Sequence, residues 1–401
     1  MPDTLLTFNT GSSTVKIGVF MVEGDRPRRV GKAVVKFASD PLTMHLLEGA
    51  DQLELPLKST ANDNLGVLMD EVFGALDRHF DLDSATAAGH RIVHGGDIFE
   101  GPVRIDEKVL AQLRSLIAMA PLHQPQSLKL IQAVEHLRPD LVQAASFDTT
   151  FHSSQTELVR RFAIPRIWHD RGIKRYGFHG LSYRYVSGAL VHQAPKIANK
   201  KVVIAHLGSG ASLCAIEGGK SRDTSMGFST LDGIPMATRP GSIDPGALLH
   251  FFGPLGKTHQ EIEDIMYHKS GLLGVSGFSG DTRELVNNGG AQAREAIELF
   301  TFRTAGEIAR LAATLGGLDG LVFTAGIGEN QPDIRADVAH RLKWLGAELD
   351  ERANACNAHT ISTSASRIAM HIVPTDEEQM IAEECLSLLR STERTSPDIA
   401  S

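Results

Sequence analysis

Short apolar runs alternate with polar turns through the first part of the chain. The segments "KIGVFMV", "KAVVKF" and "LELPL" are separated by turn residues, and β-branched and aromatic residues flank the polar cluster at 9–14. This pattern predicts strands joined by turns over residues 1–60. Residues 64–80 then carry apolar side chains at helical spacing, which predicts a helix.

Strands and helices alternate along the rest of the chain. "AAGHRIVHGG" and "LVQAASFDTTFHSS" each predict a strand that runs into a turn, and "RIAMHIV" predicts a short strand. "GLVFTAGIGEN" predicts a strand entering a glycine turn. Helices are expected at 106–120 with Asp106 as N-cap, at 180–194, at 291–315, from Pro332, and over "PTDEEQMIAEECLSLLR", with a polar, disordered tail from 391.

One pattern occurs twice. Residues 5–20, "LLTFNTGSSTVKIGVF", and residues 201–217, "KVVIAHLGSGASLCAIE", both run from an apolar strand through a small polar turn into a second strand. Two such units suggest two related halves facing one cleft. A chance repeat is the alternative, because hairpins with glycine turns are common.

Composition narrows the class of protein. A length of 401 residues favours two domains, and 42% hydrophobic with 22% charged residues is ordinary for a globular protein. The net charge of −8 and the lack of a long basic run argue against nucleic-acid binding. No apolar run is long enough to span a membrane, and no secretion signal is expected. Three widely spaced cysteines fit a reducing cytosol, so a cytoplasmic location is expected.

The candidate chemistry begins with glycines that follow strands, where the backbone can approach a ligand closely. The first of these turns contains a lysine but fails the P-loop pattern, because no glycine precedes Lys16 and no Ser or Thr follows it. Three such turns in a two-domain chain point to a bound nucleotide. They contain Gly11, Gly208 with Gly210, and Gly326 with Gly328.

Two arginines in unusual settings suggest anion binding. Arg91 and Arg239 lie beside glycine, histidine and proline, where a guanidinium can bind a carboxylate or phosphate. Asp148 follows an apolar run, and could be a base, a magnesium-linked group or a turn cap. No histidine pair has the H-E-x-x-H spacing typical of zinc sites, and most histidines are expected to be structural.

At this point the chain resembles the acetate kinase family, within the acetate and sugar kinase/Hsc70/actin superfamily. The resemblance covers residue 5 to about 390. It rests on "NTGSSTVK", "GHRIVHGG", "PLHQP", "FDTTFHSS", "YGFHGLS", "HLGSGAS", "DTSMGFSTLDG", "FTAGIGEN" and "TDEEQMIA", whose order and spacing together are highly specific.

The resemblance implies reversible phosphoryl transfer from ATP to acetate, giving acetyl phosphate and ADP, with Mg²⁺ or Mn²⁺. It also implies an α/β fold of two related ribonuclease H-like domains with a cleft that closes on the substrates. The expected N-terminal domain is 1–150 plus 380–401, and the expected nucleotide-binding and dimerisation domain is 151–379 of a homodimer.

The resemblance also assigns roles by motif match. Asp148, His179 and Arg239 should be catalytic, with Asp148 positioning magnesium or an arginine, because acetate is already ionised at pH 7. Arg91, Val93, Leu122 and Phe178 should bind acetate, and Asn9 and Glu377 should hold the metal. The expected nucleotide contacts are Ser12, Thr14, Lys16, His206, Leu207, Gly208, Ser209, Gly210, Asp281, Thr282, Arg283, Gly326, Ile327, Gly328, Glu329 and Asn330.

Several positions depart from the family pattern. Thr230 replaces a proline near the acetate pocket, Ser209 and Gln124 replace asparagines, and Pro240-Gly241-Ser242 replaces "CGD" after Arg239. A kinase for propionate or butyrate is therefore one alternative, since one methylene is worth only about 1–3 kcal/mol of discrimination. A non-metabolic ATPase of the same superfamily is the other.

Overall fold

The computed structural model describes residues 4–11, 14–36, 41–60 and 63–395, and divides the chain into two compact α/β units. The first unit comprises the chain up to Thr150 and again from Asp376, and the second comprises Phe151–Thr375. Ser12 lies outside the described residues. The sequence suggested that the chain returns to the first domain at residue 380. In the structure the first unit resumes at Asp376, because the last helix begins at Glu377 and packs on the first sheet.

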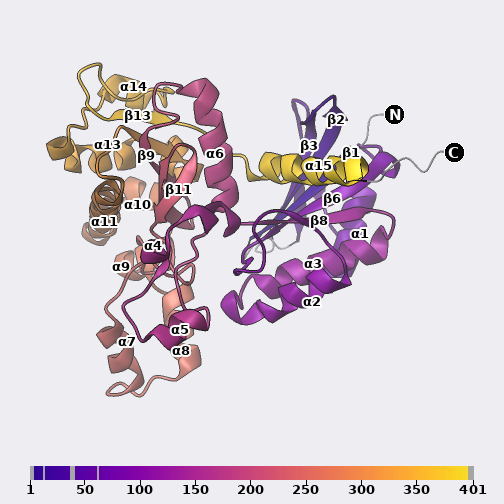
Figure 1. Cartoon of the computed structure of the whole chain (residues 1–401), viewed down its shortest axis with the longest axis horizontal. Coiled ribbons are helices and arrows are strands. Elements are labelled where there is room, and N and C mark those ends of the chain that lie inside the picture. Colours follow the sequence, from indigo (N-terminus) through magenta and orange to yellow (C-terminus); the bar gives the residue numbers. More distant parts are fainter. Residues whose placement is uncertain (1–3, 12–13, 37–40, 61–62, 396–401) are drawn as a thin grey trace. The chain divides into compact units, whose positions relative to one another are not determined.

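The sheet of the first unit has the strand order β5-β4-β3-β2-β1-β6-β8-β7. Figure 1 labels its strands β1, β2, β3, β6 and β8. Strands β3, β2 and β1 are antiparallel neighbours, whereas β1, β6 and β8 are parallel. The strands are β1 (Thr4–Thr10), β2 (Thr14–Glu23), β3 (Arg26–Lys36), β4 (Thr43–Glu48), β5 (Asp51–Pro56), β6 (Ala85–Ile92), β7 (Val103–Arg104) and β8 (Val142–Phe147).

Helices cover both faces of this sheet. Phe8 and Ile17 pack with Leu68 and Val134, which belong to α1 (Leu65–Leu76) and α3 (Gln124–Leu137). On the other face, Leu5 packs with residues of α15 (Glu377–Thr395). α2 (Glu107–Ser115) packs on α3 and is capped by Asp106, as the sequence predicted. α15 continues into the segment from 391 that was expected to be disordered.

The second unit repeats the central strand order of the first. Its sheet runs β11-β10-β9-β12-β13, with antiparallel pairs up to β9 and parallel pairs from β9 to β13. The same order and directions occur in β3-β2-β1-β6-β8. The repeat predicted from residues 5–20 and 201–217 is therefore a repeat of topology. These strands are β9 (Lys201–Leu207), β10 (Ala211–Glu217), β11 (Lys220–Thr224), β12 (Gly320–Thr324) and β13 (Ala369–Ile372).

α6 (Gly180–Gln193) packs on one face of the second sheet, where Tyr183 and Val186 contact Val202 and Val322. The long helix α11 (Ala291–Leu315) packs against β9, β10 and β11. Further helices are α4 (Glu157–Arg160), α5 (Arg166–Asp170), α7 (Pro245–Phe252), α8 (His259–His268), α9 (Gly271–Ser276), α10 (Thr282–Asn288), α12 (Ala325–Asn330), α13 (Pro332–Arg341) and α14 (Glu351–Ala355). In the described part of the chain, no helix is both long and apolar enough to cross a membrane.

Candidate active site

The ends of three parallel strands bring polar residues together in the first unit. Asn9 is near the end of β1, Arg91 near the end of β6, and Asp148 directly follows β8. Because parallel strands end at the same edge of a sheet, these residues, far apart in sequence, become neighbours. The backbone N–H of Asp148 also bonds to the carbonyl of Ile92 (3.0 Å), which fixes this edge.

Arg91 is the centre of this cluster. Its Nε and Nη2 both donate to Asp148 Oδ2, at 3.0 and 2.6 Å, and its Nη1 donates to Asn9 Oδ1 at 3.0 Å. The Arg91 side chain is 15% exposed and that of Asp148 is 1% exposed. Burial acts to lower the pKa of Arg91, but the charges of Asp148 and Glu377 outweigh it and raise that pKa above its ordinary value. The guanidinium is therefore a fixed positive charge at this edge.

The C-terminal helix adds carboxylates to the cluster. Asn9 Nδ2 donates to Glu377 Oε2 and to Glu378 Oε1, both at 2.8 Å. Glu377 Oε2 also lies 3.9 Å from Arg91 Nη1. Glu378 also forms an ion pair with Lys32, whose Nζ lies 3.6 Å from Glu378 Oε2. Both glutamates lie in the first turn of α15, where a helix favours negative charge.

The first turn predicted to bind phosphate flanks this cluster. Lys16 on β2 pairs directly with Asn9 on β1, so the two side chains lie on the same face of the sheet. The backbone N–H of Gly11 donates to the carbonyl of Thr14 (2.8 Å), which closes the turn. Val93 is buried and Leu122 is partly buried, both in the first unit.

In the second unit, two histidines stack beside the second glycine turn. His179 precedes α6 and has φ of 57°, an uncommon conformation for a non-glycine residue that often marks a functional constraint. Its ring stacks on that of His206 at the end of β9, with 4.2 Å between centroids and 15° between planes.

Each histidine is oriented by a serine. His179 Nδ1 lies 2.8 Å from Ser212 Oγ, and Ser212 is also hydrogen-bonded to the hydroxyl of Tyr183. His206 Nδ1 lies 2.8 Å from Ser182 Oγ. Nδ1 of each ring is bonded to a serine, and Nε2 is the ring nitrogen on the side of the glycine turn.

The glycine turn at 208–210 lies against those Nε2 atoms. A Cβ placed on Gly210 would be 3.5 Å from His179 Nε2, and one on Gly208 would be 3.9 Å from His206 Nε2. The carbonyl of Ser209 accepts a bond from the N–H of Ala237 (3.1 Å), which anchors the turn through backbone atoms. Leu207 is buried. The turn therefore offers backbone and two imidazoles to one region of space.

The sequence predicted a turn at the third glycine segment, and this prediction was wrong. The segment forms the helix α12. Ala325, the first residue of α12, has φ of 66°, a conformation that is uncommon for a non-glycine residue, and the helix starts directly after β12. Glu329 Oε1 accepts the backbone N–H groups of Ala325 (2.8 Å) and Thr375 (3.1 Å), and Asn330 Nδ2 donates to the carbonyl of Gly326 (3.0 Å). The buried Arg335 donates to the carbonyl of Gly328 (3.0 Å). Ile327 lies between these anchors and is half-buried.

Asp281 and Arg283 pair with each other. Asp281 caps α10 by accepting the backbone N–H of Arg283 at 2.8 Å, and its carboxylate also accepts from that guanidinium. The bond from the Arg283 side chain lowers the pKa of Asp281. Thr282 is buried, whereas Arg283 remains largely exposed at the surface.

Arg239 is held by its neighbours in the second unit. Its Nη1 donates to the carbonyl oxygen of Thr230 at 3.2 Å. Thr230 is the position where the family pattern has proline, and a proline carbonyl could accept the same bond. Phe178 is buried in this unit, and its carbonyl is 2.9 Å from His152 Nε2.

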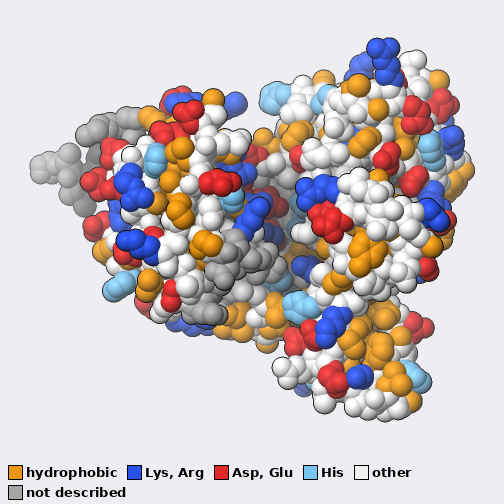
Figure 2. All heavy atoms as spheres, turned by 180° about the vertical axis from the view of Figure 1, so that it is seen from behind, with side chains coloured by type: hydrophobic (Ala, Val, Ile, Leu, Met, Phe, Trp, Pro, Cys, Tyr) orange, Lys and Arg blue, Asp and Glu red, His pale blue; other side chains and the backbone are white. Residues whose placement is uncertain are grey.

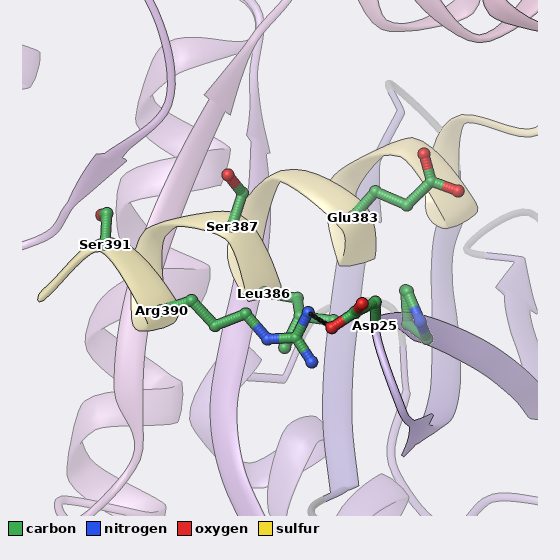
Figure 3. A pocket seen from close by; sticks show the side chains of 7 residues that line it. Asp25, Glu383, Leu386, Ser387, Arg390 and Ser391 are labelled. Carbon is green, nitrogen blue, oxygen red and sulfur yellow. Dashed lines mark hydrogen bonds and ion pairs between the residues drawn. The ribbon is translucent and has the colours of Figure 1, made fainter. Parts of the chain in front are cut away.

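A pocket elsewhere in the first unit holds none of these residues. It has a volume of about 490 Å³ and lies between α15 and the turn joining β2 and β3, with Glu383 and Leu386 on its wall (Figure 3). Arg390 points across it and donates to Asp25 Oδ1 at 2.8 Å. Because that cation is already paired, the pocket lacks the unpaired charge expected of a substrate site.

The sequence did not single out several residues that orient the site. Tyr183, Ser182, Ser212 and Thr375 all contact the histidine pair directly or through one hydroxyl. Their signal was present, since Ser212 ends "HLGSGAS" and Thr375 opens "TDEEQMIA". Only the fold reveals that both motifs support the histidine pair, Ser212 through His179 and Thr375 through Ser182.

The two α/β units with their repeated strand order define a protein of the acetate and sugar kinase/Hsc70/actin fold. The model of the acetokinase family matches residues 4–383, and the chain belongs to that family. It is 44% identical over 394 residues to the acetate kinase of Nitrobacter hamburgensis, covering 96% of each chain. It is 40% identical over 389 residues to that of Rickettsia prowazekii, covering 97% of this chain and 100% of the relative.

Solved structures agree in fold. A propionate kinase from Francisella tularensis superposes with a TM-score of 0.88 at 34% identity, covering 96% of this chain and 100% of the other. The acetate kinase of Porphyromonas gingivalis gives 0.85, also at 34% identity and with the same coverage.

Proposed function

We propose that this protein is an acetate kinase that transfers the γ-phosphoryl group of ATP to acetate, reversibly. An acetate oxygen forms the bond to the γ-phosphorus, and the bond from that phosphorus to the β–γ bridging oxygen breaks, so ADP leaves. The observation that carries the proposal is the buried guanidinium of Arg91, fixed by Asp148 at the end of parallel strands. Family membership and the named relatives support the same reaction.

Arg91 would bind the acetate carboxylate. Acetate is already an anion at neutral pH, so no residue is needed to remove a proton from it. Asp148 then serves to orient Arg91, because its Oδ2 accepts hydrogen bonds from two nitrogens of that guanidinium. Val93, Leu122 and Phe178 would contact the methyl group.

The nucleotide would be held by the second unit. Backbone groups of the turn at 208–210 and of α12 (326–330), with Asp281, Thr282 and Arg283, are assigned to ATP and ADP. His179 and Arg239 would stabilise the charge of the transferring phosphoryl group, which is the main requirement in such reactions. Thr14 and Lys16 would contact phosphate from the first unit.

The residues at the first cluster fit Mg²⁺ or Mn²⁺. Such hard cations take oxygen ligands, and Mg²⁺ is commonly held by one or two carboxylates together with substrate phosphates and water. Glu377 and the amide oxygen of Asn9 supply oxygen ligands of this kind. That amide oxygen accepts from Arg91 Nη1, and its second lone pair would serve the metal. Among the described residues, no group of three or more His, Cys, Asp or Glu side chains could hold a metal. Bound metal would therefore depend on the nucleotide for its remaining ligands, and would neutralise phosphate charge.

A propionate kinase is the second candidate, and the structural match to one from Francisella tularensis favours keeping it. Val93, which is β-branched and 2% exposed, favours the shorter substrate because an added methylene would have to displace it. Comparing kcat/KM for acetate, propionate and butyrate decides between the two. A higher value for propionate than for acetate would reverse the assignment.

We further propose a cytoplasmic homodimer formed through the second unit. The lobe of this unit that carries α7 and α8 exposes hydrophobic side chains (Figure 2). Leu249, Phe252 and Leu255 are 70%, 48% and 53% exposed, and a group of exposed apolar side chains is typical of a protein–protein interface. Light scattering coupled to size-exclusion chromatography tests the dimer, and a monomer at micromolar concentration would contradict it.

A hydroxamate assay tests the reaction itself. With ATP, acetate and Mg²⁺, hydroxylamine should trap acetyl phosphate as acetohydroxamate, and omission of ATP should abolish the signal. A chaperone-like or filament-forming ATPase of this fold would instead hydrolyse ATP at a rate indifferent to acetate. Such indifference, with no hydroxamate formed, would refute the kinase assignment.

A further inference from the structure

Thr375 lies where the chain leaves the second unit, between β13 and α15. It makes two bonds, both to groups of the second unit. Its hydroxyl donates to Ser182 Oγ at 2.8 Å, and its backbone N–H donates to Glu329 Oε1 at 3.1 Å. A residue of the connecting segment thus contacts both the helix that supports His206 and the segment assigned to nucleotide.

The hydroxyl chain has a direction. Because Thr375 donates to Ser182 Oγ, the hydroxyl hydrogen of Ser182 must point to another acceptor, and His206 Nδ1 lies within reach at 2.8 Å. A neutral imidazole that accepts at Nδ1 carries its proton on Nε2. When the ring is neutral, the chain Thr375–Ser182–His206 therefore favours the tautomer of His206 in which Ser182 donates to Nδ1.

That tautomer places a donor where phosphate binding is proposed. His206 Nε2 would lie 3.9 Å from a Cβ on Gly208, so its hydrogen would be beside the glycine turn. The other tautomer would present a lone pair there, which would repel phosphate oxygens. Fixing the proton on Nε2 thus favours anion binding without any charge on the ring.

Glu329 fixes the position of Thr375. The same Oε1 atom accepts the N–H of Thr375 and that of Ala325, the first residue of α12. A shift of α12 on nucleotide binding would therefore reach Ser182 and His206 through Thr375.

We propose that Thr375 is a positioning residue, which through Ser182 holds the proton of His206 on Nε2 and links α12 to the histidine pair. This inference rests on the proposed function, because it assigns a phosphate to the turn at 208–210. Thr375 itself touches no reacting atom in this scheme.

The test uses three variants of the full-length protein. Thr375→Val keeps the shape but removes the hydroxyl, Thr375→Ser restores it, and Thr363→Val removes a surface hydroxyl that bonds to Glu348. Loss of one hydrogen bond should lower kcat about 3- to 10-fold in Thr375→Val. KM for acetate should stay within about twofold, because this bond does not touch the acetate side. Thr375→Ser and Thr363→Val should retain the wild-type kcat.

A second readout needs no turnover. Long-range ¹H–¹⁵N spectra of ¹⁵N-histidine-labelled protein report the tautomer of each ring, and a His206→Asn sample assigns the signal of His206. Wild type and Thr375→Ser should show Nε2–H, and Thr375→Val should show a mixture of tautomers. Addition of ADP should shift the His206 signal in wild type and shift it less in Thr375→Val.

Three results would overturn the inference. The first is an Nδ1–H tautomer of His206 in wild type, and the second is an unchanged tautomer and kcat in Thr375→Val. The third is an equal loss of kcat in Thr375→Val and Thr375→Ser, accompanied by an equal fall in melting temperature. Failure of the proposed function would look different, because wild type would then make no acetyl phosphate while the tautomer could still be read.

Discussion

A single oxygen of Asp148 accepts two hydrogen bonds from Arg91, through Nε at 3.0 Å and Nη2 at 2.6 Å. Nη1 is directed instead to Asn9, which in turn holds Glu377 and Glu378. The arginine is thus oriented by neighbours on two sides. This arrangement suits a group that must present a charge at a fixed place, because its freedom is already lost before substrate arrives.

Substitution of Arg91 should weaken acetate binding. A hydrogen bond to a charged group contributes about 1.5–3 kcal/mol, so Arg91→Ala should raise KM for acetate about 10- to 100-fold. Arg91→Lys keeps the charge but not the two bonds to Asp148, and should fall between wild type and Arg91→Ala. Steady-state kinetics with acetate as the varied substrate measures this. An unchanged KM for acetate in Arg91→Ala would remove this residue from the acetate site.

Arg239→Ala should mainly lower kcat. If this guanidinium stabilises the transferring phosphoryl group, its loss should reduce kcat by about 10²-fold or more, with smaller changes in KM. The matched variant is Thr230→Pro, which keeps the carbonyl that accepts from Arg239. Thr230→Pro should therefore retain kcat within a few-fold. Equal losses in both variants would mean that Arg239 acts through the local fold.

Glu377 and Glu378 provide a matched pair for the metal. Both accept from Asn9, but Glu378 also lies beside Lys32, which engages its carboxylate. Glu377→Gln should raise the Mg²⁺ concentration needed for half-maximal rate about tenfold, because a charged oxygen ligand becomes neutral. Glu378→Gln should change this concentration much less and mainly lower the melting temperature. The reverse pattern would make Glu378 the metal ligand.

Buried histidines should make the fold sensitive to mild acid. Burial lowers the pKa of His90 and of His152 to about 4. Unfolded chains take up these protons near pH 6.5, whereas the folded protein resists them until about pH 4. The stability contributed by each histidine is therefore fully present above pH 6.5 and declines as pH falls toward 4, by up to about 3 kcal/mol.

Urea unfolding between pH 8 and 4.5 checks this expectation. His152→Gln should lower stability at pH 8, because it disrupts the bonds to Ser221 and Phe178, but its stability should fall less steeply with acid. His250→Gln serves as control, since His250 is exposed. Parallel acid slopes in wild type and His152→Gln would contradict the assignment of this dependence to His152.

The sequence predicted most of the elements because their signals are local. The helix over 64–80, the Asp106 cap and the strand–turn–strand repeat at 201–217 follow from apolar spacing and turn residues. The "GIGEN" segment was predicted as a turn but forms α12. Two glycines in this segment favoured the prediction of a turn. The helix starts with the N–H of Ala325 bonded to Glu329, whose carboxylate also accepts from the N–H of the distant Thr375.

By itself the sequence determined the strand and helix pattern, the family, and the residue types available for phosphoryl transfer. Only the tertiary structure decided which of them act together. Asn9 and Glu377 are separated by 368 positions, yet their side chains are 2.8 Å apart. Hydrogen-bond partners in the folded chain are set by sheet register and helix docking, and no local pattern encodes either of these directly. The same reason explains why Ser182 and Thr375 could be recognised as supports of His206 only after folding.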